Sequence, residues 1–169
     1  RIMISLGGVD QDNLTTRILE ILKLSNLPPK CEIKVILGSS SPWEKEVLKT
    51  ASTMPWNTEV IFGTNKMAEF MMNSDLAIGA GGISSWERCC MGLPTIMFII
   101  AENQKQVAHA LQRIGAVKIV NIAEIERELP KMFQADISSL LKRMAFVGKK
   151  ITDGTGVKRV AKTLYEKNK

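Results

Sequence analysis

The protein has 169 residues, a mass of 18.7 kDa and a formal net charge of +6, with 45% apolar and 24% charged residues. This size and composition fit one globular domain and exclude collagen-like, low-complexity and disordered proteins. Every apolar run is shorter than the roughly 20 residues of a membrane-spanning helix. No membrane segment is therefore expected.

Six short apolar runs alternate with amphipathic segments along the chain. The runs are predicted to be strands and lie at residues 2–6, 33–37, 59–62, 76–78, 94–100 and 117–120. Apolar residues at helical spacing follow them at 14–22, 43–51, 67–71, 86–93 and 107–114, and the remainder is predicted to be helical with a break near 152–156. Asp10 or Asp12 is available as the N-cap of the first helix.

Strands that alternate with helices indicate right-handed βαβ units and a parallel sheet. The run at 94–100 is apolar throughout, which predicts a strand buried on both faces. We therefore expect an α/β fold: one Rossmann-like, doubly wound parallel sheet of about six strands, in the order 3-2-1-4-5-6. A single domain would span residues 1–169.

Two helices allow a more specific prediction about their buried faces. One face is expected to carry Trp86, Cys89, Cys90 and Leu93, and the other Val107, Ala110, Leu111 and Ile114. On the second helix, His109 falls about 160° from the apolar stripe and is expected to face solvent. Cys31, Cys89 and Cys90 lack CxxC spacing and are interpreted as small apolar residues of a protein in the reducing cytoplasm.

The net positive charge belongs to the C-terminal segment. Residues 142–169 carry +7, which leaves −1 for residues 1–141. A nucleic-acid-binding stripe across the domain is therefore not indicated. The segment is typical of a solvated helical face, and a surface for anionic partners or lipid headgroups is the alternative.

A doubly wound sheet binds ligands outside the carboxyl ends of its strands, at the point where strand order reverses. The loops after strand one (Gly7, Gly8) and strand four (residues 79–85) are placed there, flanked by residues 63–66 and 101–106. Glycines at 81 and 82 let backbone approach a ligand, and free amides at a helix start attract phosphate. The hydroxyls of Ser84 and Ser85 add donors. A tight turn with Ser84 as N-cap is the alternative.

Glu87 and the amides after strand five are each open to two interpretations. Glu87 either completes a capping box with Ser84 or accepts hydrogen bonds from a ribose diol. Asn103 either caps a helix together with Gln106 or joins Gln104 in binding sugar hydroxyls. Arg88 either adds positive charge to the site or lies at the surface.

Cofactors and catalytic groups are not indicated. The GxGxxG fingerprint of dinucleotide sites and the P-loop are absent, which disfavours NAD and ATP, and no metal-ligand spacing occurs. His109 is the only histidine, and no nucleophile–base arrangement can be assembled around it. The chain thus has the character of a binding half without a catalytic residue.

Four segments carry a joint pattern: residues 7–10 (GGVD), 79–88 (GAGGISSWER), 92–95 (GLPT) and 102–104 (ENQ). Together they resemble the C-terminal nucleotide-binding domain of GT-B-fold enzymes that use UDP-sugars. The resemblance is greatest to the PseG-type UDP-sugar hydrolases of pseudaminic acid synthesis. It extends to spore-coat polysaccharide proteins of the SpsG type and, more distantly, to MurG.

The resemblance implies a role for each loop. Glu87 would hold the ribose, and backbone near Gly63 and Thr64 would contact uracil. The diphosphate would bind Gly81, Gly82, Ser84 and Ser85 with help from Gly7 and Gly8, and Asn103 and Gln104 would face the sugar. The catalytic histidine of such enzymes belongs to an N-terminal domain, which this chain lacks.

Three functions follow as alternatives. The first is the nucleotide-binding half of a UDP-sugar hydrolase that releases UDP and a free amino sugar, and the second is the same half of a glycosyltransferase. The third is a non-enzymatic interaction module that uses the basic C-terminal helices. In the first two, the last helix would pack on the N-terminal domain, so Leu164 and Tyr165 would be exposed here and offer a surface for homodimerisation.

Overall fold

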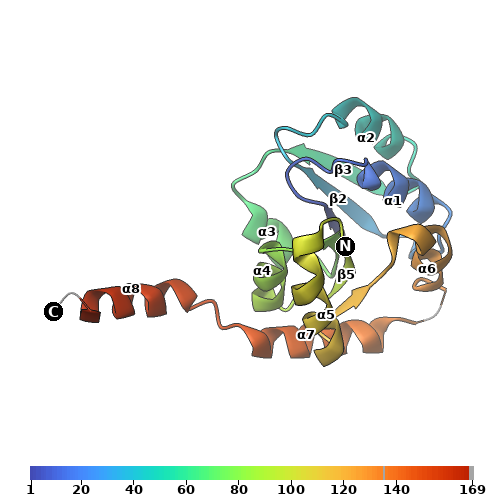
Figure 1. The fold of residues 1–169 in the computed structure, drawn as a ribbon. Coiled ribbons are helices and arrows are strands. Elements are labelled where there is room, and N and C mark those ends of the chain that lie inside the picture. The colour runs from blue at the N-terminus through green and yellow to red at the C-terminus, as the bar shows by residue number, and fades with distance from the viewer. Residues whose placement is uncertain (135, 168–169) are drawn as a thin grey trace.

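The computed structural model describes residues 1–134 and 136–167. Six strands form one parallel sheet in the order β3-β2-β1-β4-β5-β6, which confirms the predicted order (Figure 1). The strands are β1 (Ile2–Ser5), β2 (Glu32–Leu37), β3 (Asn57–Phe62), β4 (Leu76–Ala80), β5 (Thr95–Phe98) and β6 (Val117–Ile119).

Helices follow the strands as expected, and extra helices end the chain. The helices are α1 (Leu14–Lys23), α2 (Glu44–Ala51), α3 (Met67–Met72), α4 (Ser84–Met91), α5 (Lys105–Ile114), α6 (Ile125–Lys131), α7 (Ser138–Ile151) and α8 (Gly156–Lys167). Two short 3₁₀ turns, Glu102–Gln104 and Ile122–Glu124, precede α5 and α6. The break between α7 and α8 falls at the predicted place.

The core lies on both faces of the sheet, because successive side chains of a strand point to opposite faces. Ile2 and Ile4 pack with residues of α1 and α6, whereas Met3 packs toward α3 on the other face. All four residues of β5 are buried, as predicted for a strand covered on both sides, but β5 is shorter than the predicted run at 94–100 and Ile100 is 40% exposed. The sheet is therefore covered on both faces, and the loops that follow its strands lie at its carboxyl edge.

The start of α1 differs from the prediction in detail. Asn13 is the N-cap residue, and its side chain accepts a hydrogen bond from the Thr16 amide. The buried carboxylate of Asp10 accepts from the amides of Leu14 (3.0 Å) and Thr15 (2.9 Å). Asp10 thus satisfies two first-turn amides from outside the helix, while the predicted alternative, Asp12, is exposed.

The predicted buried face of α5 is partly wrong. Ala108 and Leu111 are buried, whereas Ala110 and Ile114 are exposed. The helix begins only after a 3₁₀ turn, and the small Ala108 packs with Met97 of β5 in the same cluster. His109 is exposed, as predicted.

The predicted buried face of α4 is also partly wrong. Ser85, Arg88 and Cys89 face the sheet, while Trp86 is 40% exposed. Cys31 and Cys89 are buried free thiols, as expected for small core residues. Burial raises the pKa of both thiols.

The two C-terminal helices behave differently from one another. Helix α7 packs closely on α4, because Gly148 leaves room for Cys89: a Cβ at Gly148 would lie 3.4 Å from the Cys89 Cα. Helix α8 projects away from the rest of the molecule (Figure 1). Its apolar residues Val157, Val160, Leu164 and Tyr165 are 82%, 60%, 59% and 68% exposed.

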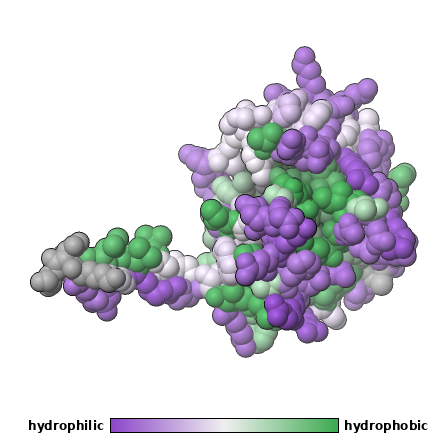
Figure 2. Space-filling view, in the orientation of Figure 1, coloured by the Kyte–Doolittle hydropathy of each residue, from purple (hydrophilic) through white to green (hydrophobic). Residues whose placement is uncertain are grey.

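Helix α8 is amphipathic although its apolar side chains are largely exposed. Apolar and hydrophilic side chains lie on opposite sides of the projecting helix (Figure 2). Lys158, Arg159 and Lys162 are exposed, which agrees with a solvated basic face; Lys169 and the side chain of Lys167 lie outside the described part. Within that part, no helix has the length and apolar character needed to cross a bilayer.

Candidate functional site

The loops at the carboxyl edge of the sheet form the candidate site. Residues after β1, the start of α1 and the loop after β5 enclose a cavity of about 370 Å³. Among its lining residues are Gly7, Gly8, Arg17 and Gln104. The strand-order reversal lies between β1 and β4, so this is the edge where the sequence places the ligand.

The loop after β4 leaves three consecutive backbone amides without acceptors. The N–H groups of Gly82, Ile83 and Ser84 donate to no acceptor in residues 1–134 and 136–167. By contrast, the next amide, that of Ser85, donates to the Gly82 carbonyl at 3.0 Å. Free amides at the start of a helix form an anion-binding arrangement, because their dipoles and the helix dipole both favour negative charge.

Gly82 makes this arrangement of amides possible. Its φ is +116°, which residues with a Cβ adopt only at a cost. A Cβ built there would meet nothing within 4 Å, so the surface above the residue is open. The glycine is thus explained by backbone conformation and not by crowding.

The two serines of the loop have different environments. Ser84 is half-buried, whereas Ser85 is 1% exposed and its hydroxyl lies 3.4 Å from the Arg88 guanidinium, which donates to it. The Ser85 amide is also occupied. Ser84 can therefore offer its hydroxyl and amide to a ligand directly. Ser85 uses its amide and hydroxyl in hydrogen bonds within the protein, which stabilise the loop.

Glu87 is exposed and lines a second cavity, of about 270 Å³, between α3 and α4. The start of α4 has no side-chain capping hydrogen bond. The capping-box interpretation of Glu87 with Ser84 therefore does not describe this structure. The carboxylate is left available one helical turn from the free amides.

The residues predicted to face the sugar lie beside the loop after β4 (residues 81–84, the glycine-rich loop). Gln104 packs on Gly81, where a Cβ would lie 3.0 Å from the Gln104 Cβ. The Gln104 Oε1 accepts a hydrogen bond from the Ile100 amide at 3.0 Å, which fixes the side chain and leaves its NH₂ group to donate. Asn103 is exposed, and the helix start after it has no side-chain cap, so the capping alternative is not formed.

In the loop after β3, the contacts that hold the turn are made mainly by backbone groups. Gly63 has a φ of +50° and is exposed, and its amide extends the sheet by donating to the Leu37 carbonyl. The Thr64 hydroxyl accepts from the Lys66 amide at 3.0 Å. These contacts fix a turn at the same sheet edge as the glycine-rich loop.

The sequence left open whether Arg88 adds charge to the site or lies at the surface, and the structure shows that it is buried. It is 2% exposed and is among the largest fully buried side chains. Its Nη2 donates to the Ala80 carbonyl at 2.6 Å, and desolvation by burial lowers its pKa to about 10. The signal in the sequence is Gly79, since a Cβ there would lie 2.9 Å from the Arg88 Nη1 and 2.7 Å from the Ser5 carbonyl oxygen.

Arg17 is a cation that lines the first cavity, the one beside Gly7 and Gly8. Its guanidinium forms a two-point ion pair with Glu126, with Nε–Oε1 and Nη2–Oε2 distances of 2.6 and 2.8 Å. This hydrogen bonding lowers the pKa of Glu126. The pair ties α1 to α6 beside Gly7 and Gly8, and it partly neutralises the positive charge there.

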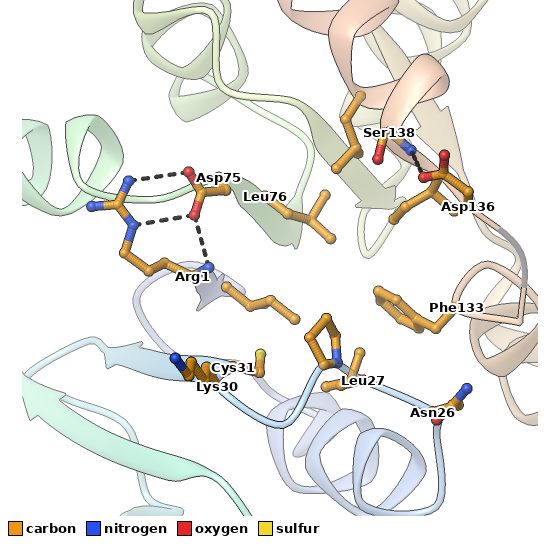
Figure 3. Close-up of a pocket in the computed structure, with 14 residues that line it drawn as sticks. Arg1, Asn26, Leu27, Lys30, Cys31, Asp75, Leu76, Phe133, Asp136 and Ser138 are labelled. Carbon is orange, nitrogen blue, oxygen red and sulfur yellow. Dashed lines mark hydrogen bonds and ion pairs between the residues drawn. The ribbon is translucent and has the colours of Figure 1, made fainter.

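A larger cavity, of about 420 Å³, lies at the opposite end of the sheet. Leu27, Leu76 and Phe133 surround it, and Arg1 reaches Asp75 at its side (Figure 3). This ion pair lowers the pKa of Asp75 to about 2. The cavity sits at the amino ends of the strands and holds none of the predicted site residues.

Groups for metal binding do not come together. In the described ranges, no three His, Cys, Asp or Glu side chains are placed to hold a metal ion. The exposed His109 lies on α5 and is absent from the residues lining both site cavities. The free amides of Gly82 to Ser84 line neither cavity, and Glu87 and Gln104 line different ones. The loop offers its amides to an anion, and the Glu87 carboxylate is available to a polyol.

Sequence comparison gives a family match over most of the chain. The model of the glycosyltransferase family 28 C-terminal domain matches residues 1–164. "Spore coat polysaccharide biosynthesis protein SpsG" of Bacillus subtilis is 30% identical over 172 aligned residues, covering 98% of this chain and 50% of that protein. The chain thus spans about half the length of this relative.

Solved structures share the fold. MurG of Acinetobacter baumannii superposes with a TM-score of 0.76 at 20% identity, covering 98% of this chain and 49% of that one. Anabaena HepE, solved in complex with UDP-glucose, gives a TM-score of 0.69 at 13% identity, covering 98% and 48%.

Proposed function

Because the chain belongs to the glycosyltransferase family 28 C-terminal domains, we propose that it is the nucleotide-binding half of a UDP-sugar enzyme. The observation that carries the proposal is the run of free amides at Gly82, Ile83 and Ser84, with the exposed carboxylate of Glu87 on the same helix start. The amides suit a diphosphate, and the carboxylate suits the two hydroxyls of a ribose.

The ligand would lie across the glycine-rich loop. Its diphosphate contacts the amides of Gly82 to Ser84 and the Ser84 hydroxyl, with Gly7 and Gly8 opposite. Its ribose reaches Glu87, and its base lies toward Gly63 and Thr64. Its sugar lies toward Gln104, whose NH₂ group is free to donate, and toward the exposed Asn103.

The reaction we favour is hydrolysis, in which water attacks the anomeric carbon and UDP leaves with the free amino sugar. The catalytic base is supplied by a separate N-terminal half of the intact protein. Two observations support this division: the site here contains no histidine, and the SpsG relative is about twice as long. Transfer to an alcohol acceptor is the second candidate, favoured by the family match.

Isothermal titration of the 169-residue chain with UDP and with ADP tests nucleotide binding. We expect UDP to bind and ADP to bind more weakly. Absence of UDP binding by the folded chain, or a preference for ADP, contradicts the proposal. Incubation of the intact protein with a UDP-amino sugar, without acceptor, separates the two reactions, because only a hydrolase then releases free sugar.

A further inference from the structure

Arg88 is a buried cation without a carboxylate partner. No ion pair to its guanidinium occurs among the described residues, and its Nε has no hydrogen-bond partner. Buried charges in proteins are normally paired, because removing an ion from water is energetically unfavourable. The structure therefore leaves a positive charge beneath the surface that is hydrogen-bonded only to neutral oxygens within the described residues, and the Glu87 carboxylate offsets it only at longer range.

The position of the guanidinium relates this charge to the glycine-rich loop. Nη2 donates to the Ala80 carbonyl at 2.6 Å and to the Ser85 hydroxyl at 3.4 Å, and these residues bracket the loop on its two sides. Between them lie the three free amides. The helix directs the side chain of Arg88 back toward its own N-terminus, which is the geometry expected of long helical side chains.

The neighbouring chain is shaped to admit the guanidinium. Gly79 lies in β4, and a Cβ there would come within 2.9 Å of Nη1 and 2.7 Å of the Ser5 carbonyl oxygen. A buried strand would otherwise favour a larger apolar residue at this place. The missing side chain thus provides the volume that holds the cation between the ends of β1 and β4.

We propose that Arg88 is a positioning residue that makes the loop selective for a phosphate-bearing ligand: its guanidinium fixes the loop from below and supplies the positive charge that an incoming diphosphate neutralises. The inference rests on the proposed function for the location of the diphosphate. Because the guanidinium is 2% exposed, it acts through the Ala80 carbonyl, the Ser85 hydroxyl and the electric field, without touching the ligand.

The test compares charged and uncharged ligands in matched variants. Isothermal titration measures UDP, uridine and inorganic pyrophosphate against the unchanged chain, Arg88→Met and Arg88→Lys. We expect Arg88→Met to weaken UDP and pyrophosphate by roughly tenfold or more, since 1.4 kcal/mol corresponds to tenfold, and to change uridine binding much less. Arg88→Lys should recover part of the loss, because it keeps the charge and loses the planar fork.

Arg113→Met is the control, since it removes an equal charge from the exposed end of α5 and should leave all three affinities unchanged. An equal effect of Arg88→Met on UDP and uridine, or no effect on either, overturns the inference. If the unchanged chain binds pyrophosphate but not UDP, the proposed nucleotide function is wrong. The inference about Arg88 is then decided by whether Arg88→Met weakens pyrophosphate binding. Binding of neither ligand overturns both.

A measurement on the unchanged chain covers the case in which Arg88→Met does not fold. The Arg88 Nε–H is buried, so its ¹⁵N–¹H resonance is expected to be observable near neutral pH; its loss in Arg88→Lys assigns it. Titration with UDP or pyrophosphate should shift this resonance, and titration with uridine should not. A resonance that is unmoved by the charged ligands, or moved equally by uridine, contradicts the proposal.

Discussion

Among single residues, Glu87 separates ligand binding from helix stability. The side chain is exposed, and α4 starts without a side-chain cap. We expect Glu87→Ala to weaken UDP binding by about 1–3 kcal/mol, the value of charge-assisted hydrogen bonds, with an unchanged melting temperature. Titration calorimetry and thermal unfolding measure the two effects.

The control for Glu87 is Glu20→Ala, which removes an exposed glutamate from α1. It should leave UDP affinity and melting temperature as they are. If Glu87→Ala keeps normal UDP affinity but has a lower melting temperature, the result would contradict the binding role and support the capping interpretation.

Gly82 tests the backbone of the same loop. Its positive φ of +116° predicts that Gly82→Ala destabilises the fold by about 1–3 kcal/mol and lowers UDP affinity, because the strained residue moves the free amides. Denaturant unfolding gives the stability. Gly8→Ala is the matched control, since its Cβ would also meet open space and its φ is not positive, so little loss of stability is expected. Equal stability of the two variants would argue against the strain.

The sequence predicts which loops form the candidate site, but it does not predict the orientations of all their side chains. Glycines at 81 and 82 followed by serines predict a helix start with free amides, and the structure has them. Burial of Arg88 was not predicted, because arginine is almost never fully buried unless it is paired. Only the space left by Gly79, which depends on the tertiary approach of α4 to β4, explains it.

For whole elements, hydrophobic patterns predicted strand order better than helix faces. Order follows from alternation and from the handedness of crossovers, which are general rules. The buried face of α5 depends on the 3₁₀ turn that precedes it, and the buried face of α4 depends on the room that Gly79 leaves. Neither local feature is visible in the periodicity of apolar residues.

Helix α8 depends on hydrogen bonds at its start, because a helix of 12 residues that projects from the molecule (Figure 1) is marginal in water. Asp153 accepts from the Thr155 amide (2.9 Å) and from Arg159 Nη1. These bonds, the first above all, hold the pKa of Asp153 well below its usual range. A depressed carboxyl pKa stabilises the fold above the unfolded pKa, of about 4. This contribution is lost as pH falls toward the folded value.

We therefore expect the amides at the start of α8 to lose protection from hydrogen exchange as pH is lowered from 6 to about 2. Asp153→Ala should show the low protection already at neutral pH, and the two chains should converge in acid. Exchange measured by NMR at residues 159–162, which begin with the Arg159 amide bonded to the Thr155 carbonyl, reports both effects. The same pH dependence in Asp153→Ala would show that another group is responsible.

At the scale of the whole molecule, the candidate site lies at one edge of the sheet. The loops after β1, β3, β4 and β5 all end there, while the cavity of Figure 3 lies at the other edge. We propose that a second domain completes the site, and the exposed apolar side of α8 and the half-length match to SpsG support this proposal. We expect the affinity of this half for UDP to be modest, because only one side of the ligand is enclosed.

Binding of a diphosphate by the amides after β4 is tested most directly by titrating the ¹⁵N-labelled chain with UDP and following the backbone amide resonances. The largest shifts should occur at Gly82, Ile83 and Ser84, with smaller shifts at Glu87 and around Gly63. Saturable shifts confined to the cavity around Leu27, Leu76 and Phe133, or no saturable shift in the loop after β4, would contradict the placement of the site.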